Sequence, residues 1–201
     1  MIAILDYGVG NLMSIHNMFN KIGVDSVITS DVEEIRNADK YLLSGVGSFD
    51  HGINSLKSAS FFKTLEKEVL DKKKPILGIC LGMQLLTNSS EEGKEKGLGW
   101  IDAQTIRFDL DNKKLSIPHM GWSKVSIVNT NNIFRNLEEN RFYFVHSYHV
   151  FCNDESNELA TANYGKIFTC SINEDNIYGV QFHPEKSHKF GMKLLKNFEG
   201  I

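Results

Sequence analysis

Short apolar runs alternate with amphipathic segments through the first half of the chain. Four apolar runs are predicted to be strands, at residues 2–5, 24–29, 41–43 and 76–79. The segments between them have the apolar spacing of helices, at residues 12–22, 32–37 (with Asp31 as the predicted N-cap), 52–56 and 61–70. This alternation favours a parallel sheet with helices on both faces.

The second half of the chain is richer in strands. Seven further segments are predicted to be strands, at residues 105–108, 125–128, 142–145, 148–152, 159–163, 167–172 and 177–182. Residues 91–99 have the composition of a surface loop, and residues 192–198 suggest a closing helix. We therefore predict a single domain over residues 1–201 with an α/β fold. Its central sheet is mostly parallel and flanked by helices, with additional antiparallel strands in the second half.

A cysteine between two glycines stands where the fourth predicted strand meets a helical segment. Residues 78–82 read Gly-Ile-Cys-Leu-Gly, and this strand–turn–helix setting is that of a nucleophile elbow. Small neighbours let the chain turn tightly, and a helix N-terminus favours a thiolate. The alternative is a buried structural cysteine, since free cysteines are often buried. The glycines and the change from strand to helix favour Cys80 as a nucleophile.

A histidine and a glutamate follow the last predicted strand. His183 supplies an imidazole that can take and return a thiol proton, and Glu185 can hold that imidazole in one tautomer. Pro184 between them limits how far they can separate. The alternative is a surface histidine beside a turn carboxylate, and a position directly after a buried strand argues against it.

These two motifs resemble those of the class I (triad) glutamine amidotransferases. Within that class, the chain is most similar to the glutaminase subunits of imidazole glycerol phosphate synthases, because four other motifs match along its length. They are Asp-Tyr-Gly-Val-Gly-Asn-Leu (6–12), Gly-Val-Gly-Ser-Phe (45–49), Pro-His-Met-Gly-Trp (118–122) and Tyr-Phe-Val-His-Ser-Tyr (143–148). The resemblance covers essentially the whole chain and implies a catalytic triad of Cys80, His183 and Glu185.

The glycine-rich segment after the third strand matters for the same chemistry. Attack on an amide builds negative charge on its oxygen, which then needs preorganised N–H donors. Residues 45–48 resemble the oxyanion strand of the family, and the resemblance implies the N–H groups of Gly47 and Leu81 as the donors. Ser44 stands where the family usually has proline, which would restrict this loop. The alternative is an ordinary strand-to-helix loop.

Glutamine recognition needs partners for an α-ammonium and an α-carboxylate group. Gln84 lies one helical turn beyond Cys80 and is predicted to face the same pocket. By resemblance, Ser147 and Tyr148 hold the amino-acid end of the substrate. His146 and His149 flank that pair, and we interpret both as hydrogen-bonded structural residues.

An enzyme that consumes ammonia gains from a sealed supply, because free ammonia equilibrates with ammonium in water. The resemblance implies a partner-facing surface of five residues, Asn11, Met120, Trp122, Tyr143 and Lys186. The expected partner is a barrel-type cyclase subunit that forms a heterodimer with this chain. Taken alone, Trp122 suits a core and Lys186 suits a solvated surface.

Composition agrees with a compact cytoplasmic enzyme. The 201 residues carry a formal net charge of −3, and the one basic run, at 72–74, does not suggest nucleic-acid binding. No apolar run approaches membrane-spanning length, and the N-terminus lacks the features of a signal peptide. The cysteines form no zinc pattern and suit a reducing compartment, with Cys152 and Cys170 interpreted as structural. We expect neither a metal nor an organic cofactor.

The sequence thus predicts a glutaminase that converts glutamine to glutamate and ammonia through a thioester on Cys80. By resemblance, the ammonia passes to the cyclase, which makes imidazole glycerol phosphate in histidine biosynthesis. Three alternatives stay open: ammonia supply to an enzyme that amidinates surface sugars, a γ-glutamyl hydrolase or stand-alone peptidase, and a binding subunit without catalysis. We also expect slow hydrolysis by the free subunit, with the 45–48 loop holding its donors away until a partner docks.

Overall fold

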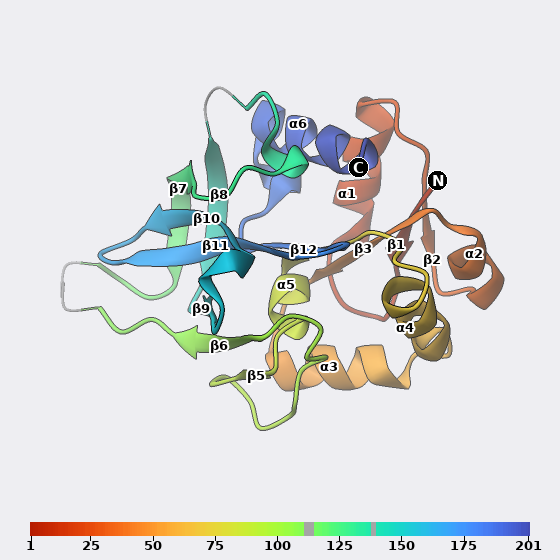
Figure 1. The fold of residues 1–201 in the computed structure, drawn as a ribbon, viewed down its shortest axis with the longest axis horizontal. Helices are drawn as coiled ribbons and strands as arrows, with labels where there is room; N and C mark the ends of the chain where they lie inside the picture. Colours follow the sequence, from red (N-terminus) through yellow and green to blue (C-terminus); the bar gives the residue numbers. More distant parts are fainter. Residues whose placement is uncertain (111–114, 138–139) are drawn as a thin grey trace.

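A computed structural model describes residues 1–110, 115–137 and 140–201 (Figure 1). Within these residues, twelve strands join one sheet, whose main path runs in the order β2-β1-β3-β4-β12-β11-β10-β7-β8. Its parallel part consists of β1 (Ile2–Leu5), β2 (Ser26–Thr29), β3 (Lys40–Gly45), β4 (Ile76–Cys80) and β12 (Ile177–Val180). The parallel strands place their carboxyl ends along one edge, where ligand sites of open α/β sheets form.

The remaining strands form the mostly antiparallel half of the molecule, seen on the left of Figure 1. Four of them continue the main path: β11 (Ile167–Glu174), β10 (Glu158–Asn163), β7 (His119–Ile127) and β8 (Arg141–His146). Three lie off that path: β5 (Ser89–Ser90), β6 (Ala103–Arg107) and β9 (Tyr148–Cys152). The predicted mixture of parallel and antiparallel strands is confirmed.

Helices cover both faces of the sheet because alternate strand residues face opposite sides. In β1, Ile2 and Ile4 join one apolar core while Ala3 and Leu5 join the other. The first core lies under α1 (Leu12–Lys21) and α6 (His188–Glu199). The second lies under α2 (Val32–Asn37), α3 (Phe49–Ser58), α4 (Phe62–Leu70) and α5 (Leu81–Leu85). Short 3₁₀ turns at Asn132–Phe134, Glu155–Asn157 and Pro184–Lys186 complete the described elements.

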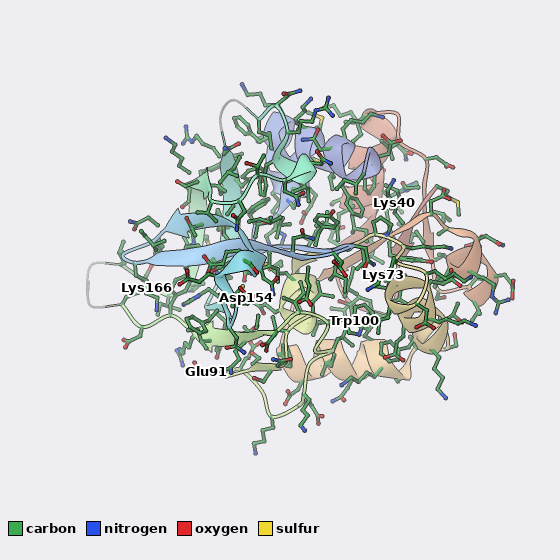
Figure 2. The ribbon with its side chains drawn as sticks, viewed as in Figure 1. Lys40, Lys73, Glu91, Trp100, Asp154 and Lys166 are labelled. Atoms are coloured by element: carbon green, nitrogen blue, oxygen red, sulfur yellow. The ribbon has the colours of Figure 1, made fainter. Side chains whose placement is uncertain are left out.

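A side-chain cap sets the start of α2. The Asp31 carboxylate accepts from the N–H groups of Glu33 and Glu34 at 2.9 Å, which confirms its predicted role as the N-cap of α2. Trp100 is buried in the core that α3 and α5 cover, whereas Glu91 and Asp154 are exposed (all three labelled in Figure 2). Among the helices of the described residues, none has the length and apolarity to cross a bilayer.

Two predicted strand boundaries are wrong in ways that matter for the site. β7 begins at His119, six residues before the predicted start, because its first half alternates buried and exposed positions without forming an apolar run. β12 ends at Val180, so Gln181 and Phe182 lie beyond the strand although both are buried. The short β5 lies just before the predicted 91–99 loop and was not predicted.

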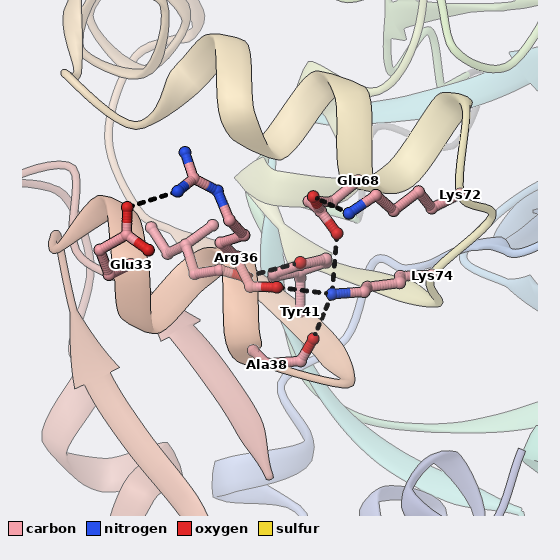
Figure 3. Close-up of polar contacts among 8 residues, drawn as sticks. Glu33, Arg36, Ala38, Tyr41, Glu68, Lys72 and Lys74 are labelled. Atoms are coloured by element: carbon pink, nitrogen blue, oxygen red, sulfur yellow. Dashed lines mark hydrogen bonds and ion pairs between the residues drawn. The ribbon is translucent and has the colours of Figure 1, made fainter.

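A buried carboxylate paired with two partly exposed lysines lies at the amino ends of β3 and β4 (Figure 3). Glu68 of α4 is 2% exposed, and its two oxygens lie 2.7 Å from Lys72 Nζ and 2.8 Å from Lys74 Nζ. Lys74 also donates to the carbonyls of Arg36 and Ala38, each at 2.8 Å. One lysine therefore joins α4 to the segment between α2 and β3, and this cluster secures the end of the sheet away from Cys80.

Candidate active site

Cys80 is the last residue of β4 and directly precedes α5. Its backbone has φ 54° and ψ −109°, a conformation that non-glycine residues adopt at a cost of about 1–3 kcal/mol. The flanking glycines permit the turn, because a Cβ on Gly82 would lie 1.8 Å from the Leu43 carbonyl oxygen and one on Gly78 would lie 2.7 Å from the Gly82 oxygen. The strand–turn–helix context predicted for this cysteine is therefore present, with the strain typical of a nucleophile elbow.

His183 and Glu185 form a buried pair beside the carboxyl end of β12. His183 Nδ1 lies 2.7 Å from Glu185 Oε1, and the two side chains are 2% and 6% exposed. The 3₁₀ turn Pro184–Lys186 brings the carboxylate back to the ring that precedes it. The backbone of His183 is held as well, since its N–H donates to the Tyr143 carbonyl at 2.9 Å. Glu185 thus fixes the ring through Nδ1, and the Tyr143 carbonyl fixes the backbone that carries it.

One cavity of about 330 Å³ collects most of the predicted site. Seven of the eight predicted catalytic, oxyanion and substrate residues line it: Gly47, Cys80, Leu81, Gln84, Ser147, Tyr148 and His183. The eighth, Glu185, lies behind the His183 ring. Segments separated by more than a hundred residues in the sequence thus converge at one edge of the sheet.

The charge state of His183 follows from its neighbours. Burial opposes a charged ring, but the interactions with Cys80 and Glu185 outweigh it and raise the pKa of His183 to about 10. Its Nε2 is buried and makes no hydrogen bond of normal geometry to the described residues. A protonated imidazole between a thiol and a carboxylate is the arrangement that stabilises a thiolate and then returns a proton.

The oxyanion segment is tied to the first loop of the chain. The Tyr7 hydroxyl donates to the Ser44 carbonyl at 2.9 Å, and a Cβ on Gly45 would lie 2.4 Å from that hydroxyl oxygen. Ser44 is buried within β3, so the loop proper begins at Val46. Gly47 has φ +116°, a conformation that favours glycine. The serine that replaces the usual proline of the family therefore lies in a regular strand.

Two polar residues, one in the cavity lining and one beside Cys80, were not predicted from the sequence. Glu92 lines the cavity, and its Oε2 accepts from the Phe49 N–H at 2.8 Å, although residues 91–99 were interpreted as a plain surface loop. Gln181 is completely buried, and its Nε2 lies 3.7 Å from Cys80 Sγ. Gln181 directly precedes the segment that carries His183, which is the one signal that could have identified it.

The five residues predicted to face a partner lie at or near the surface. Met120 and Trp122 are 61% and 39% exposed on β7, although both are apolar. Trp122 pairs with Tyr143 across β7 and β8, with ring centroids 6.2 Å apart, and Lys186 Nζ lies 5.8 Å from the Tyr143 ring centroid. Asn11 is exposed and caps α1 through the Ser14 N–H at 3.4 Å.

The other candidate groups are held in structural environments. His146 and His149 are buried, and each places Nδ1 near a backbone carbonyl, at 2.7 Å from Tyr148 O and 3.2 Å from Val150 O. Burial lowers the pKa of His146 to about 3 and that of His149 to about 4, so both are neutral. Cys152 and Cys170 are buried free thiols. In the described part of the chain, no three histidine, cysteine or carboxylate side chains gather as a metal site would require.

Comparison with known proteins identifies the class. The family described as Glutamine amidotransferase class-I matches residues 3–199, so the chain belongs to the class I glutamine amidotransferases. A relative from Methanococcus maripaludis, named Imidazole glycerol phosphate synthase subunit HisH 2, is 59% identical over 199 residues, with 98% of each chain covered. The HisH of Leptospira borgpetersenii is 45% identical, with all of both chains covered. Within its class, the chain is therefore a member of the HisH subunit family.

Solved structures agree on the fold. A structure titled as a glutamine amidotransferase superimposes with a TM-score of 0.77 and 14% identity, over 100% of this chain and 99% of its own. The structure of PurLQS from Thermotoga maritima gives a TM-score of 0.72 at 18% identity, over 99% and 97% of the two chains. At these identities the likeness concerns the fold alone.

Proposed function

We propose that Cys80, His183 and Glu185 are the catalytic triad of a glutaminase that supplies ammonia for imidazole glycerol phosphate synthesis. The observation that carries the proposal is the meeting of the strained Cys80 elbow and the His183–Glu185 pair in one cavity. The names of the full-length relatives supply the product. The three free thiols suit a reducing, cytoplasmic setting.

The chemistry follows from the proton positions. The Cys80 thiolate attacks the side-chain amide carbon of glutamine, and the N–H groups of Gly47 and Leu81 stabilise the oxyanion. His183 gives its Nε2 proton to the departing ammonia, and a γ-glutamyl thioester remains on Cys80. His183 then takes a proton from water, which attacks the thioester, and glutamate leaves. Glu185 holds the ring through Nδ1.

The cavity offers matching partners for the amino-acid end of the substrate. Glu92 supplies a carboxylate in the lining for the α-ammonium group, with its Oε2 also accepting from the Phe49 N–H. Gln84, Ser147 and Tyr148 contribute polar groups to the lining for the α-carboxylate and α-ammonium groups. A small polar amino acid with a side-chain amide fits this set better than a peptide chain, which argues against the peptidase alternative.

The exposed aromatic surface beside the cavity is proposed to receive the cyclase. Apolar side chains as exposed as Met120 and Trp122, bordered by Lys186, are typical of an interaction site. Tyr143 links this surface to the site, because its carbonyl accepts from the His183 N–H. A docked partner would therefore contact the strand that holds the catalytic imidazole, which supports slow hydrolysis by the free subunit.

The test is to co-purify the chain with a barrel-type cyclase and to measure glutamine-dependent formation of imidazole glycerol phosphate. We expect glutamate release to rise strongly in the complex. Cys80→Ala should abolish glutamine-dependent product formation while the same complex still uses added ammonium salt. Cys152→Ala serves as the matched control and should keep normal turnover, because its thiol is buried away from the cavity.

Each contrary outcome removes a defined part of the proposal. Glutamine turnover by Cys80→Ala would exclude the thioester route. Full glutaminase activity of the free subunit would exclude partner activation. Ammonia delivery to a sugar-amidinating enzyme, with no imidazole glycerol phosphate formed, would move the chain to the surface-glycan alternative.

A further inference from the structure

Gln181 contacts both Cys80 and Gln84, which line the cavity, yet no step of the mechanism uses it. It follows β12 directly and is completely buried. Its Oε1 accepts from Gln84 Nε2 at 3.1 Å, and its own Nε2 lies 3.7 Å from Cys80 Sγ. Because both ends of this buried amide are engaged, its oxygen and its NH₂ group have fixed positions.

A backbone carbonyl fixes the direction of this amide chain. The Tyr148 carbonyl oxygen can only accept, so the Gln84 amide group 3.4 Å away presents its NH₂ end to it. The same NH₂ group faces Gln181, which therefore presents its oxygen to Gln84. The NH₂ group of Gln181 is consequently left to point at the Cys80 sulfur.

The carbonyl that sets this direction is itself anchored by two neutral histidines. His146 Nδ1 lies 2.7 Å from the Tyr148 oxygen and must carry a proton, so its Nε2 accepts from His119 Nδ1 at 3.0 Å. His119 Nε2 then accepts from the Ser123 hydroxyl at 2.9 Å. Burial lowers the pKa of His119 to about 4, so neither ring brings a charge to the chain. Each hydrogen bond from Ser123 to the Tyr148 carbonyl therefore has one possible donor and one possible acceptor.

We propose that Gln181 is a positioning residue whose side-chain N–H donates to the Cys80 thiolate, in an orientation imposed by Gln84. The inference rests on the proposed function, because a thiolate nucleophile is what the hydrogen bond would stabilise. Hydrogen bonds to an ionised acceptor are stronger than those to a neutral one, so this contact favours the charged sulfur. Gln181 also keeps the sulfur directed into the cavity, while Gln84 links that alignment to substrate binding.

The experiment measures the pH dependence of Cys80 alkylation by iodoacetamide, with peptide mass spectrometry to identify the labelled thiol. Burial raises the pKa of Cys152 to about 12 and also raises that of Cys170, so labelling between about pH 5 and 10 reports Cys80. Gln181→Met keeps the volume and removes the donor. We expect the midpoint of its alkylation profile to rise by about one pH unit.

Two further variants and one control make the result specific. Gln181→Glu replaces the amide by an acid of the same shape and should move the midpoint at least as far. Gln84→Met leaves Gln181 in place but frees its orientation, so a smaller upward movement is expected. Gln104→Glu makes the same chemical change at an exposed position of β6 and should leave the profile unchanged. In the complex, Gln181→Met should lower kcat with little change in KM, whereas Gln84→Met should raise KM.

The outcomes separate this inference from the proposed function. An unchanged midpoint in a folded Gln181→Met or Gln181→Glu variant overturns the inference, and if neither folds, an unchanged midpoint in Gln84→Met does so. In either case the wild-type complex still turns over glutamine and the proposed function stands. A wild-type complex without glutaminase activity removes the proposed function itself. Lower stability without movement of the midpoint would show that Gln181 only packs the site.

Discussion

Two buried carboxylates lie at opposite ends of the same parallel strands, and their surroundings differ. Glu68, at the amino ends, is 2% exposed and has a lysine within ion-pair distance of each oxygen. Glu185, at the carboxyl ends, is 6% exposed and pairs through one oxygen with an imidazole. Its other oxygen has no hydrogen-bond partner among the described residues. Glu68 Oε2 also lacks a hydrogen bond of regular geometry, but the Lys74 ammonium lies 2.8 Å from it, whereas Glu185 Oε2 has no such partner among the described residues.

The difference indicates that the cluster at the amino ends serves stability and that the site at the carboxyl ends serves chemistry. The amino-end cluster pairs one carboxylate with two lysines, and Lys74 also donates to two backbone carbonyls. The carboxyl-end site combines a strained cysteine backbone, a ring nitrogen without a regular partner and a half-paired carboxylate. Strain and incomplete pairing concentrate at functional sites because the surrounding structure supports them. The comparison predicts opposite consequences for matched substitutions at the two ends.

Glu185→Gln should give the largest effect, a fall in kcat of about a thousandfold. The amide can still accept from His183 Nδ1, but it no longer stabilises the imidazolium. The ring loses one of the two neighbours that favour its charged form but can become neutral, so the free energy of unfolding should fall by about 1 to 2 kcal/mol, less than at Glu68. Steady-state glutaminase assays of the complex and urea unfolding of the subunit measure the two quantities. A kcat within tenfold of wild type would remove Glu185 from the triad.

Glu68→Gln should do the reverse and lower the free energy of unfolding by about 3 kcal/mol, with kcat within a factor of about two. Burial alone would raise the pKa of Glu68, but Lys72 and Lys74 outweigh burial and lower it. The stabilisation is therefore present above the ordinary value of 4.5 and is lost as the pH falls through the lower folded-state value. Urea unfolding at several pH values checks this. A kcat loss comparable to that of Glu185→Gln would end the distinction between the two sites.

The site at the carboxyl ends of the strands could be predicted from the sequence, whereas the ion cluster at the amino ends could not. The alternating strands and helices and the Cys80 elbow could be predicted because apolar spacing and flanking glycines are local signals. The Glu68 cluster could not, since a glutamate on a helix and a lysine before a strand are ordinary surface residues until the fold brings them together. Glu92 and Gln181 were missed for the same reason. Their roles depend on contacts with Phe49 and Cys80, which are distant in the sequence.

His183 should titrate in the folded subunit near its raised pKa of about 10, well above its ordinary value of 6.5. Its pairing therefore stabilises the fold fully below about pH 6.5, and that stabilisation is lost as the pH rises through 10. Cys80→Ala removes one of the two favourable neighbours and should lower the titration midpoint by at least about one pH unit. NMR of labelled histidine rings provides the measurement. An unchanged midpoint would mean that the sulfur and the ring do not interact.

The smallest expected effect comes from two buried tyrosine hydroxyls associated with opposite ends of β3. Tyr41, at the amino end, donates to the Ile35 carbonyl at 2.8 Å, and Tyr7 donates to the Ser44 carbonyl at 2.9 Å, near the carboxyl end. Each change to phenylalanine leaves one buried carbonyl without this donor. Both should therefore lower the free energy of unfolding by about 1 kcal/mol.

Only Tyr7→Phe should also change catalysis, because the Ser44 carbonyl lies at the start of the segment that carries Gly47. Loosening that segment misplaces an oxyanion donor, so we expect kcat of the complex to fall several-fold with Tyr7→Phe and to stay unchanged with Tyr41→Phe. Parallel unfolding and glutaminase measurements on the two variants decide the matter. Equal kcat values would show that the oxyanion segment keeps its shape without Tyr7, and that the carboxyl end is less sensitive than the unsatisfied groups around Glu185 suggest.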